Sequence, residues 1–472
     1  LVFTGLLHGQ DMIVRVYAPD WQTLNPLSEK FSLDIASVTV GMWYDIVADH
    51  TTLERIMQSG LTYEVIVPSL SQVKDEVRAS YLSYAETNDS LAQLAANYPA
   101  ICKLDSLPIP TMNGNWLYGV KISDNPHLEE DDEPGMLVDG LHHSREWACP
   151  PVVMFFADSI LQAYGSVPGI TDIIDNTEIY IFPIINADGY LYDYPAGYWW
   201  RKNREPFGGY IGTDCNRNYG GCSPDIVGDW GAVSTDGACH HPNDILFCGA
   251  AAYSGDEVRA LSMFVREHTI NAYISYHSSG EVVMWGWGWT NQPTPDGALH
   301  TQVGTTMANM IGSLYGGTYD PGQLSVILYE VSGSSLDWVY SWCHWVGGFS
   351  NLSFTVELGT QFYQPQNDLD EMCYENFKAL EYIAGFTDII ILLTDGLVPP
   401  PDIHPLDTVP TDFTISWNAK HADDNNPIAW ELVELAEPSV IEDDLEGGTE
   451  RWLLNGYTLS TAQSHSGTYS LF

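Results

Sequence analysis

Continuously apolar runs and amphipathic stretches alternate through the middle of the chain. The clearest apolar runs cover residues 135–141, 178–185, 271–277 and 352–358. Unbroken runs of this kind are typical of strands that are covered by helices on both faces. Residues 255–268 carry apolar side chains at helical spacing, and Ser254 with Glu257 predicts a capping box at the start of this helix. The pattern predicts an α/β domain with a mostly parallel or mixed twisted sheet and helices on both of its faces.

Shorter elements precede this domain. Strand patterns at 12–18, 42–49 and 62–68 surround a short helix at 51–60, with Thr51 or Thr52 as its N-cap and Gly60 as its C-cap. Strands and a helix in so few residues predict a small α+β unit of the split β-α-β, ferredoxin-like kind. The polar stretch 69–80 is then either a linker open to cleavage or the start of an amphipathic helix.

Proline marks the next boundary, at residues 398–410, and strand-like patterns follow it. We therefore expect three parts: an α+β unit with its linker at 1–78, the α/β domain at 79–395, and β modules resembling a sandwich at 396–472. The last pattern breaks off inside a domain.

Composition narrows the class of protein. The 472 residues are 45% hydrophobic, enough for large cores, and 17 basic against 62 acidic residues give a net charge of −45. Such a chain repels nucleic acid and anionic membrane surfaces. The acidity favours a solvated surface over a site for a basic partner. No apolar run approaches the roughly 18 residues of a membrane span.

The eight cysteines form an even set that suits disulfides, with at least one bridge expected among Cys222, Cys239 and Cys248. Cysteine use and acidity together favour a secreted protein, although no signal peptide is visible in the sequence. The spacing alone does not determine which cysteines pair.

Candidate metal chemistry begins at the segment HHSRE, residues 142–146. Only His143 stands three residues before Glu146, and a His-x-x-Glu turn between a strand and a helix can supply two of the roughly three protein ligands of a catalytic zinc ion. His277, at the end of an apolar strand, is a candidate for the third. Glu357 also ends an apolar strand, where a carboxylate is costly unless it is paired or functional. Each residue alone has an ordinary structural interpretation.

Five blocks in order resemble the zinc carboxypeptidases of the carboxypeptidase A/B type, over about residues 81–395. They are HSREW, NADG followed by WRKNR, TDCNRN, YISYHS, and LYEVSGSSLDW leading to FTVELG. The resemblance implies one Zn²⁺ in the catalytic domain, held by His143, Glu146 and His277, the His₂Glu set known for carboxypeptidase A. It implies that Asp214 fixes the tautomer of His143. It also implies that Glu357 is the general base and that Arg201 stabilises the oxyanion.

The same resemblance implies how the substrate is held. Asn216 and Arg217 would bind the terminal carboxylate, Tyr329 would close over it, and Arg145 would hold the peptide further upstream. An internal amide would leave the charge of Arg217 unpaired, which is how an exopeptidase rejects internal bonds.

Specificity is expected from the block 331–338. In the family an acidic residue at the pocket floor selects C-terminal lysine or arginine, but the matching residue here is Leu336. Ser334 and Thr355 add only small polar groups, so we expect apolar or aromatic C-terminal residues to be preferred. One departure is Ser279, which stands where animal members often have tyrosine.

The resemblance extends to the flanking parts. The N-terminal unit resembles pro-domains that cap the active site until they are cleaved off, although a simple folding module remains an alternative. The tail resembles β-sandwich modules of secreted bacterial peptidases.

We therefore expect a monomeric, secreted metallocarboxypeptidase that acts on the C-termini of peptides or proteins. Two alternatives are a zinc peptidase that cleaves cell-wall peptides and a non-catalytic binding protein on the same fold. The Asn216–Arg217 pair disfavours the first, and the presence of Glu357 with all three ligands disfavours the second.

Overall fold

The computed structural model describes residues 11–27, 32–70, 81–130, 133–220, 230, 238–314, 316–387 and 389–390, and four two-residue strands beyond residue 401. The expected linker at 69–80 lies almost wholly outside the described residues. Most of the tail also lies outside them. There, β15 (Asp402–Ile403) pairs with β16 (Trp417–Asn418), and β17 (Leu459–Ser460) pairs with β18 (Ser470–Leu471). The β-sandwich stays a prediction.

The N-terminal unit is a four-stranded antiparallel sheet in the order β2-β3-β1-β4. Its elements are β1 (Met12–Tyr17), α1 (Trp21–Leu24), a 3₁₀ turn (Asn25–Leu27), β2 (Ile35–Thr39), β3 (Trp43–Ala48), α2 (His50–Ser59) and β4 (Tyr63–Val67). This order, with β1 inside the sheet, agrees with the predicted ferredoxin-like unit. The sequence interpretation missed the edge strand β2.

Of the two caps predicted for α2, the C-cap is confirmed and the N-cap is wrong. Gly60 ends the helix with a φ of 78°, as predicted, because a residue without a side chain adopts the left-handed region without strain. The N-cap is Asp49 rather than Thr51 or Thr52, since its carboxylate accepts a hydrogen bond from the Thr52 amide at 2.7 Å.

An eight-stranded mixed sheet forms the centre of the second domain, in the order β13-β12-β14-β11-β7-β8-β6-β5. Its strands are β5 (Cys102–Ser106), β6 (Tyr118–Ile122), β7 (Gly135–Gly140), β8 (Glu178–Phe182), β11 (Ala272–Ser278), β12 (Val282–Trp285), β13 (Asp320–Gln323) and β14 (Leu352–Leu358). The four central strands β14, β11, β7 and β8 run parallel. Every residue of β7, β8 and β11 is buried, which confirms that the apolar runs are strands covered on both faces.

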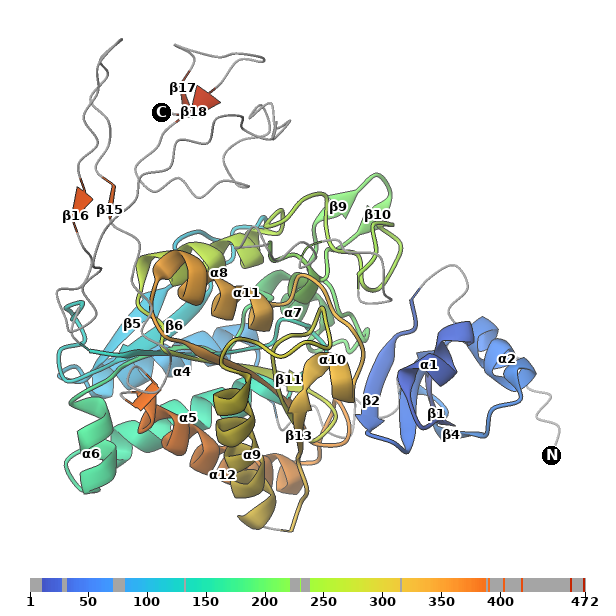
Figure 1. Cartoon of the computed structure of the whole chain (residues 1–472), viewed down its shortest axis with the longest axis horizontal. Coiled ribbons are helices and arrows are strands. Elements are labelled where there is room, and N and C mark those ends of the chain that lie inside the picture. The colour runs from blue at the N-terminus through green and yellow to red at the C-terminus, as the bar shows by residue number, and fades with distance from the viewer. Residues whose placement is uncertain are drawn as a thin grey trace.

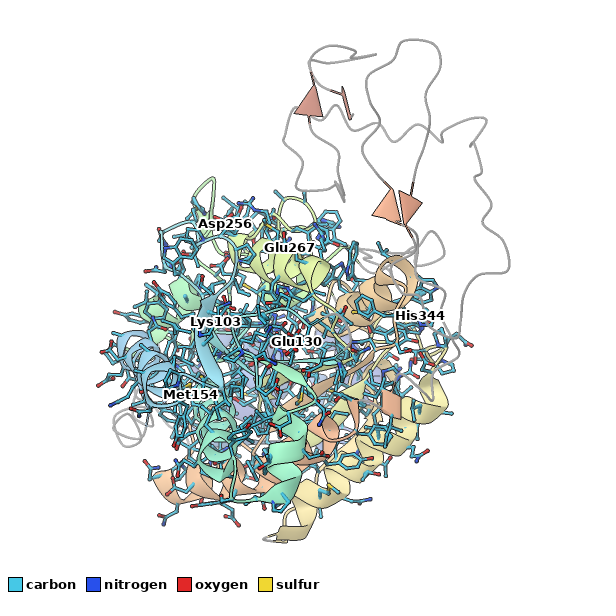
Figure 2. All side chains as sticks on the ribbon, turned by 90° about the vertical axis from the view of Figure 1, so that its left-hand side faces the viewer. Lys103, Glu130, Met154, Asp256, Glu267 and His344 are labelled. Carbon is cyan, nitrogen blue, oxygen red and sulfur yellow. The ribbon has the colours of Figure 1, made fainter. Side chains whose placement is uncertain are left out.

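Helices cover both faces of this sheet (Figure 1). They are α4 (Tyr84–Asn97), α5 (Cys149–Ala163), α6 (Pro168–Ile174), α7 (Ala187–Asp193), α8 (Asp256–Glu267), α9 (Gly297–Leu314), α10 (Leu324–Ile327), α11 (Ser335–Ser341) with a π turn (Trp342–Gly347), and α12 (Gln366–Ala384). A small hairpin pairs β9 (Pro206–Phe207) with β10 (Tyr210–Ile211). Helices α5, α9 and α12 pack together on one side. In Figure 2, Met154 of α5 and the two ends of α8, Asp256 and Glu267, lie on opposite sides of the sheet.

The predicted capping box of α8 is wrong. The helix begins at Asp256 after Gly255, and no side chain caps it. Both expected partners are engaged elsewhere: the Ser254 hydroxyl accepts from the amide of Asn218 at 3.2 Å, and the buried Glu257 carboxylate accepts from Asn203 at 2.9 Å.

Two further expectations concern membrane-spanning helices and disulfide bonds. No described helix combines the length and the apolar character needed to cross a membrane. The seven described cysteines form no disulfide with one another. Cys222 lies outside the described residues, so a bridge that includes it stays a prediction.

Candidate metal centre and active site

The carboxyl ends of the central parallel strands bring the predicted ligands together. β7 ends at Gly140, and the following turn carries His143 and Glu146, while His277 lies near the end of the neighbouring strand β11. The Glu146 carboxylate lies 2.7 Å from Nδ1 of His143 and 3.0 Å from Nδ1 of His277. All three side chains are buried, and their ligand atoms lie within 4.8 Å of one another. Two imidazoles and a carboxylate at this spacing suit a tetrahedral zinc ion with one open position.

Asp214 joins a metal ligand to an arginine. One carboxylate oxygen lies 3.2 Å from Nε2 of His143, and the other accepts from Nε of Arg201 at 2.9 Å. A proton on Nε2 in the first contact would leave the Nδ1 lone pair for a cation, which is the role that the resemblance implies for Asp214. The sequence interpretation missed the second contact, which orients the Arg201 guanidinium through the same carboxylate.

Burial and charge set the protonation of these groups. Burial alone would raise the pKa of the Glu146 and Asp214 carboxyls, but His143 with His277, and Arg201 with His143, hold these pKa values well below the usual range. Burial lowers the pKa of His277, so its imidazole is neutral and can donate a lone pair. Glu146 and His277 are therefore in the form that a divalent cation requires.

Glu357 stands beside the ligands on β14, directly across from His277 in the parallel register. Burial and the Glu146 carboxylate raise the pKa of Glu357 to about 8, against the opposing effect of Arg201. A carboxylate whose pKa is raised toward neutrality binds and releases a proton readily. Its position confirms that this strand-end carboxylate belongs to the cleft.

One cleft contains most of the predicted site. Its lining includes His143, Glu146, Arg201, Asn216, Arg217, Tyr329, Thr355 and Glu357. Asn216 is already engaged: its amide oxygen accepts from the Ser335 amide at 2.8 Å, and its nitrogen lies 3.3 Å from Nε2 of His277. Arg217 is buried and its Nη1 donates to the Asn216 carbonyl at 2.8 Å, but its Nε has no hydrogen-bond partner among the described residues. A buried guanidinium with a free donor suits an incoming carboxylate.

Leu336 and Ser334 lie behind the wall of the cleft rather than on it. Leu336 packs in a buried apolar cluster with Val282, Met284, Leu324 and Val331, the last three of which line the cleft. The hydroxyl of Ser334 caps α11 by accepting from the Asp337 amide. The wall residues Met284 and Leu324 were not predicted, because nothing in the sequence distinguishes them from core residues.

Asp337, next to Leu336 in the sequence, is engaged away from this wall. Both carboxylate oxygens of the buried Asp337 accept from the Gly288 amide, at 3.0 and 2.9 Å. Asp337 is therefore held by the backbone and does not line the cleft.

The N-terminal unit forms the remaining wall. Residues 35–38 of β2 and Tyr44 of β3 line the same cleft as the metal ligands. Arg145, which was expected to hold substrate, instead makes a two-pronged ion pair with Asp34 at 2.7 and 2.5 Å. Figure 1 shows the unit against the side of the domain that carries α10, with β2 nearest to it.

Comparison with known proteins agrees with this geometry. The model of the zinc carboxypeptidase family matches residues 87–379. The chain belongs to the zinc carboxypeptidase family. It is thus a peptide hydrolase, and the family implies zinc for the buried His₂Glu set.

Sequence relatives and solved structures also include carboxypeptidases. Human carboxypeptidase B is 28% identical over 358 residues, 72% of this chain and 81% of that protein. Rat mast cell carboxypeptidase A is 27% identical over 374 residues, 75% of this chain and 86% of that protein. The carboxypeptidase A of Helicoverpa armigera has a similar fold, with a TM-score of 0.69 at 20% identity over 81% of this chain and 98% of its own. Thrombin activatable fibrinolysis inhibitor also shares the fold, with a TM-score of 0.68 at 22% identity over 82% of this chain and 100% of its own.

Proposed function

We propose that this zinc carboxypeptidase family member releases single amino acids from the C-termini of peptides, with a preference for apolar or aromatic residues. The observation that carries the proposal is the convergence in one cleft of the His143–Glu146–His277 set, Glu357, and a buried Arg217 with a free guanidinium donor. An arginine placed to bind a free carboxylate selects the end of a chain over its interior.

The residues of the cleft have complementary roles. His143, Glu146 and His277 would hold the zinc ion, which would supply a Lewis acid for the scissile carbonyl and for the attacking water. Glu357 takes a proton from the attacking water and passes it to the departing amine nitrogen as the C–N bond breaks. Arg201, oriented by Asp214, donates hydrogen bonds to the carbonyl oxygen as negative charge develops there.

Substrate binding uses the other polar groups. Arg217 pairs with the terminal carboxylate, and Asn216 holds this arginine in place through its backbone carbonyl. Tyr329 closes over the terminal residue. Arg145 binds the peptide further upstream once Asp34 has left it.

The apolar cleft wall of Met284, Leu324 and Val331, which Leu336 backs, supports the proposed specificity. A terminal lysine or arginine would bury its charge against these side chains without a carboxylate to pair with, which is costly. Thr355 contributes one buried hydroxyl without a partner among the described residues, and this hydroxyl can bind a polar group or a water molecule.

We further propose that the N-terminal unit is an inhibitory pro-domain that is removed by cleavage within residues 71–80. Three contacts support this proposal, and the first is the Asp34–Arg145 ion pair. In the second, the Ser279 hydroxyl donates a hydrogen bond to the Ala36 carbonyl at 2.9 Å. In the third, the ring of Trp21 packs on that of Tyr329 with 4.9 Å between the ring centroids. Two open pockets, lined by residues of both the N-terminal unit and the catalytic domain, lie along this interface. The acidity and the family relation favour action outside the cell, as a monomer.

The test uses the chain cut at an engineered protease site within 71–80. We expect release of free C-terminal phenylalanine from a blocked peptide, loss of this activity with a zinc chelator, and weaker turnover of the matched peptide that ends in arginine. The variant Glu357→Gln should retain zinc and lose most activity, whereas Glu267→Gln, at the exposed end of α8, should behave as wild type.

Three results would contradict the proposal. They are an intact activity of Glu357→Gln, cleavage of internal bonds in a peptide with an amidated C-terminus, and better turnover of the arginine peptide. The last result alone would remove the specificity and leave the reaction in place.

A further inference from the structure

A buried polar cluster lies directly behind the metal ligands and is built around His142, the first histidine of the doublet. The imidazole of His142 is fully buried and lies nearly parallel to that of His277, with 5.6 Å between the ring centroids and an interplanar angle of 19°. The ring of His142 therefore forms one face of the space that the ligand His277 occupies.

Both nitrogens of His142 are held. Nε2 lies 2.9 Å from the hydroxyl of Tyr219, and Nδ1 lies 3.3 Å from the hydroxyl of Ser275. Ser275 in turn donates to a carboxylate oxygen of Asp139 at 2.7 Å, so its own oxygen is free to accept from Nδ1 of His142. Tyr219 then donates to Nε2. This arrangement of donors and acceptors fixes the plane and the tautomer of the ring.

The strand register anchors the cluster. Asp139 on β7 lies directly across from Ser275 on β11, and the other carboxylate oxygen accepts from the hydroxyl of Tyr273 at 2.7 Å. Tyr273, Ser275 and His277 alternate along β11 and face the same side of the sheet. The two sheet strands therefore hold the base of the cluster, while His142 connects this base to the metal ligand.

The two histidine ligands differ in their supports. His143 has the Asp214 carboxylate on its second nitrogen, which orients the ring. Nε2 of His277 has an amide nitrogen of Asn216 at 3.3 Å and no carboxylate among the described residues. A ligand ring without such a partner depends on packing to keep its orientation.

We propose that His142, held by Tyr219 and by Ser275 with Asp139, is a positioning residue that orients His277 for zinc through the stacked faces of the two rings. This inference rests on the proposed function and adds a role to a residue with no contact to substrate. Because the effect acts on a ligand, it changes zinc retention before it changes substrate binding.

The experiment compares zinc release from three variants of the full chain. Tyr219→Phe and Ser275→Ala each remove one hydrogen bond of His142 and leave the metal ligands untouched. Tyr180→Phe is the matched control, because it also removes a buried tyrosine hydroxyl, bonded to Glu129 and Glu178 at 2.6 and 2.7 Å, from another strand of the same sheet.

We expect Tyr219→Phe and Ser275→Ala to release zinc to a chelator about tenfold faster than wild type, and Tyr180→Phe to release it at the wild-type rate. The visible spectrum of the cobalt-substituted protein should shift in the first two variants and not in the control. The two readouts need no substrate, so the closeness of Tyr219 to Arg217 in sequence does not affect them.

The result that overturns the inference is a release rate within about threefold of the control for both variants. If one variant does not fold, the other decides. If the wild-type protein binds no zinc, the proposed function itself fails. If the wild type holds zinc and the variants hold it equally well, only the role of His142 fails.

Discussion

Removing the Asp34 carboxylate tests how the N-terminal unit is held over the cleft. Arg145 is fully buried, and both of its terminal nitrogens donate to Asp34. In Asp34→Asn the guanidinium loses its counter-charge and keeps at most one of the two hydrogen bonds. Breaking a buried pair by removing one partner costs about 3–5 kcal/mol. Since the Asp34 side chain is 20% exposed, we expect a cost at or just below the lower end of that range, about 2–3 kcal/mol less stabilisation of the closed arrangement.

This loss of stabilisation predicts a measurable increase in the rate of hydrolysis by the uncleaved chain. A change of about 2–3 kcal/mol shifts the equilibrium between the closed and the open arrangement by roughly 30- to 150-fold. Hydrolysis by the intact, uncleaved Asp34→Asn chain should rise by this factor, up to the limit set by the cleaved enzyme. The assay uses a short blocked dipeptide that ends in phenylalanine, so that the upstream contact with Arg145 does not enter the rate. The remaining contacts, from Ser279 to Ala36 and between Trp21 and Tyr329, are unchanged by the substitution.

Two controls make the result interpretable. After cleavage, Asp34→Asn and wild type should have the same rate, because the substitution lies in the released unit. Glu64→Gln removes an equal charge from β4, where Glu64 contacts Tyr17 of the same unit, and should leave the intact chain as slow as wild type. The reasoning is refuted if intact Asp34→Asn stays at the wild-type rate while the cleaved forms are equally active, or if intact wild type is already as fast as cleaved enzyme.

Three further predictions concern the catalytic domain. Asp214→Asn should weaken zinc binding about 10- to 100-fold in chelator competition, because it removes the carboxylate that orients His143; an unchanged affinity would contradict this role. Met284→Asp, on the cleft wall, should raise kcat/KM for peptides ending in arginine relative to phenylalanine by about tenfold or more, whereas the uncharged control Met284→Asn should not, and equal ratios in the two variants would reject the specificity argument. Burial raises the pKa of Glu257 to about 8, so the folded state holds this proton more tightly than the unfolded state, and the stability that it contributes is lost as the pH rises from about 4.5 through about 8. The melting temperature of Glu257→Gln should therefore fall less than that of wild type between pH 5 and pH 8.5, and equal falls would show that this carboxyl does not titrate as described.

Local patterns predicted the elements wherever one kind of residue dominated a segment. The runs at 135–141 and 271–277 became buried strands because apolar side chains dominate them, and the polar side chains of Asp139 and Ser275 bond to each other rather than to water. The capping box of α8 failed for the opposite reason. Ser254 and Glu257 have the right spacing, but the side chain of each is hydrogen-bonded to a tertiary partner instead of to the helix end.

For the site, spacing and block order were enough to nominate His143, Glu146, His277 and Glu357, which the structure brings together, since zinc chemistry demands particular side chains at the ends of particular strands. Partners from distant segments were not readable in this way. Asp34 lies 111 positions before Arg145, and no local pattern ties the two together.

The sequence by itself determined the family, the candidate metal ligands and the class of reaction, because these depend on which side chains are present and in what order. Only the tertiary structure decided what the neighbouring residues do. It placed Asp34 on Arg145, put Leu336 behind the cleft wall rather than on it, and set the ring of His142 against His277. Such contacts depend on the register of parallel strands and on the docking of one domain on another, which are long-range properties that no single segment encodes.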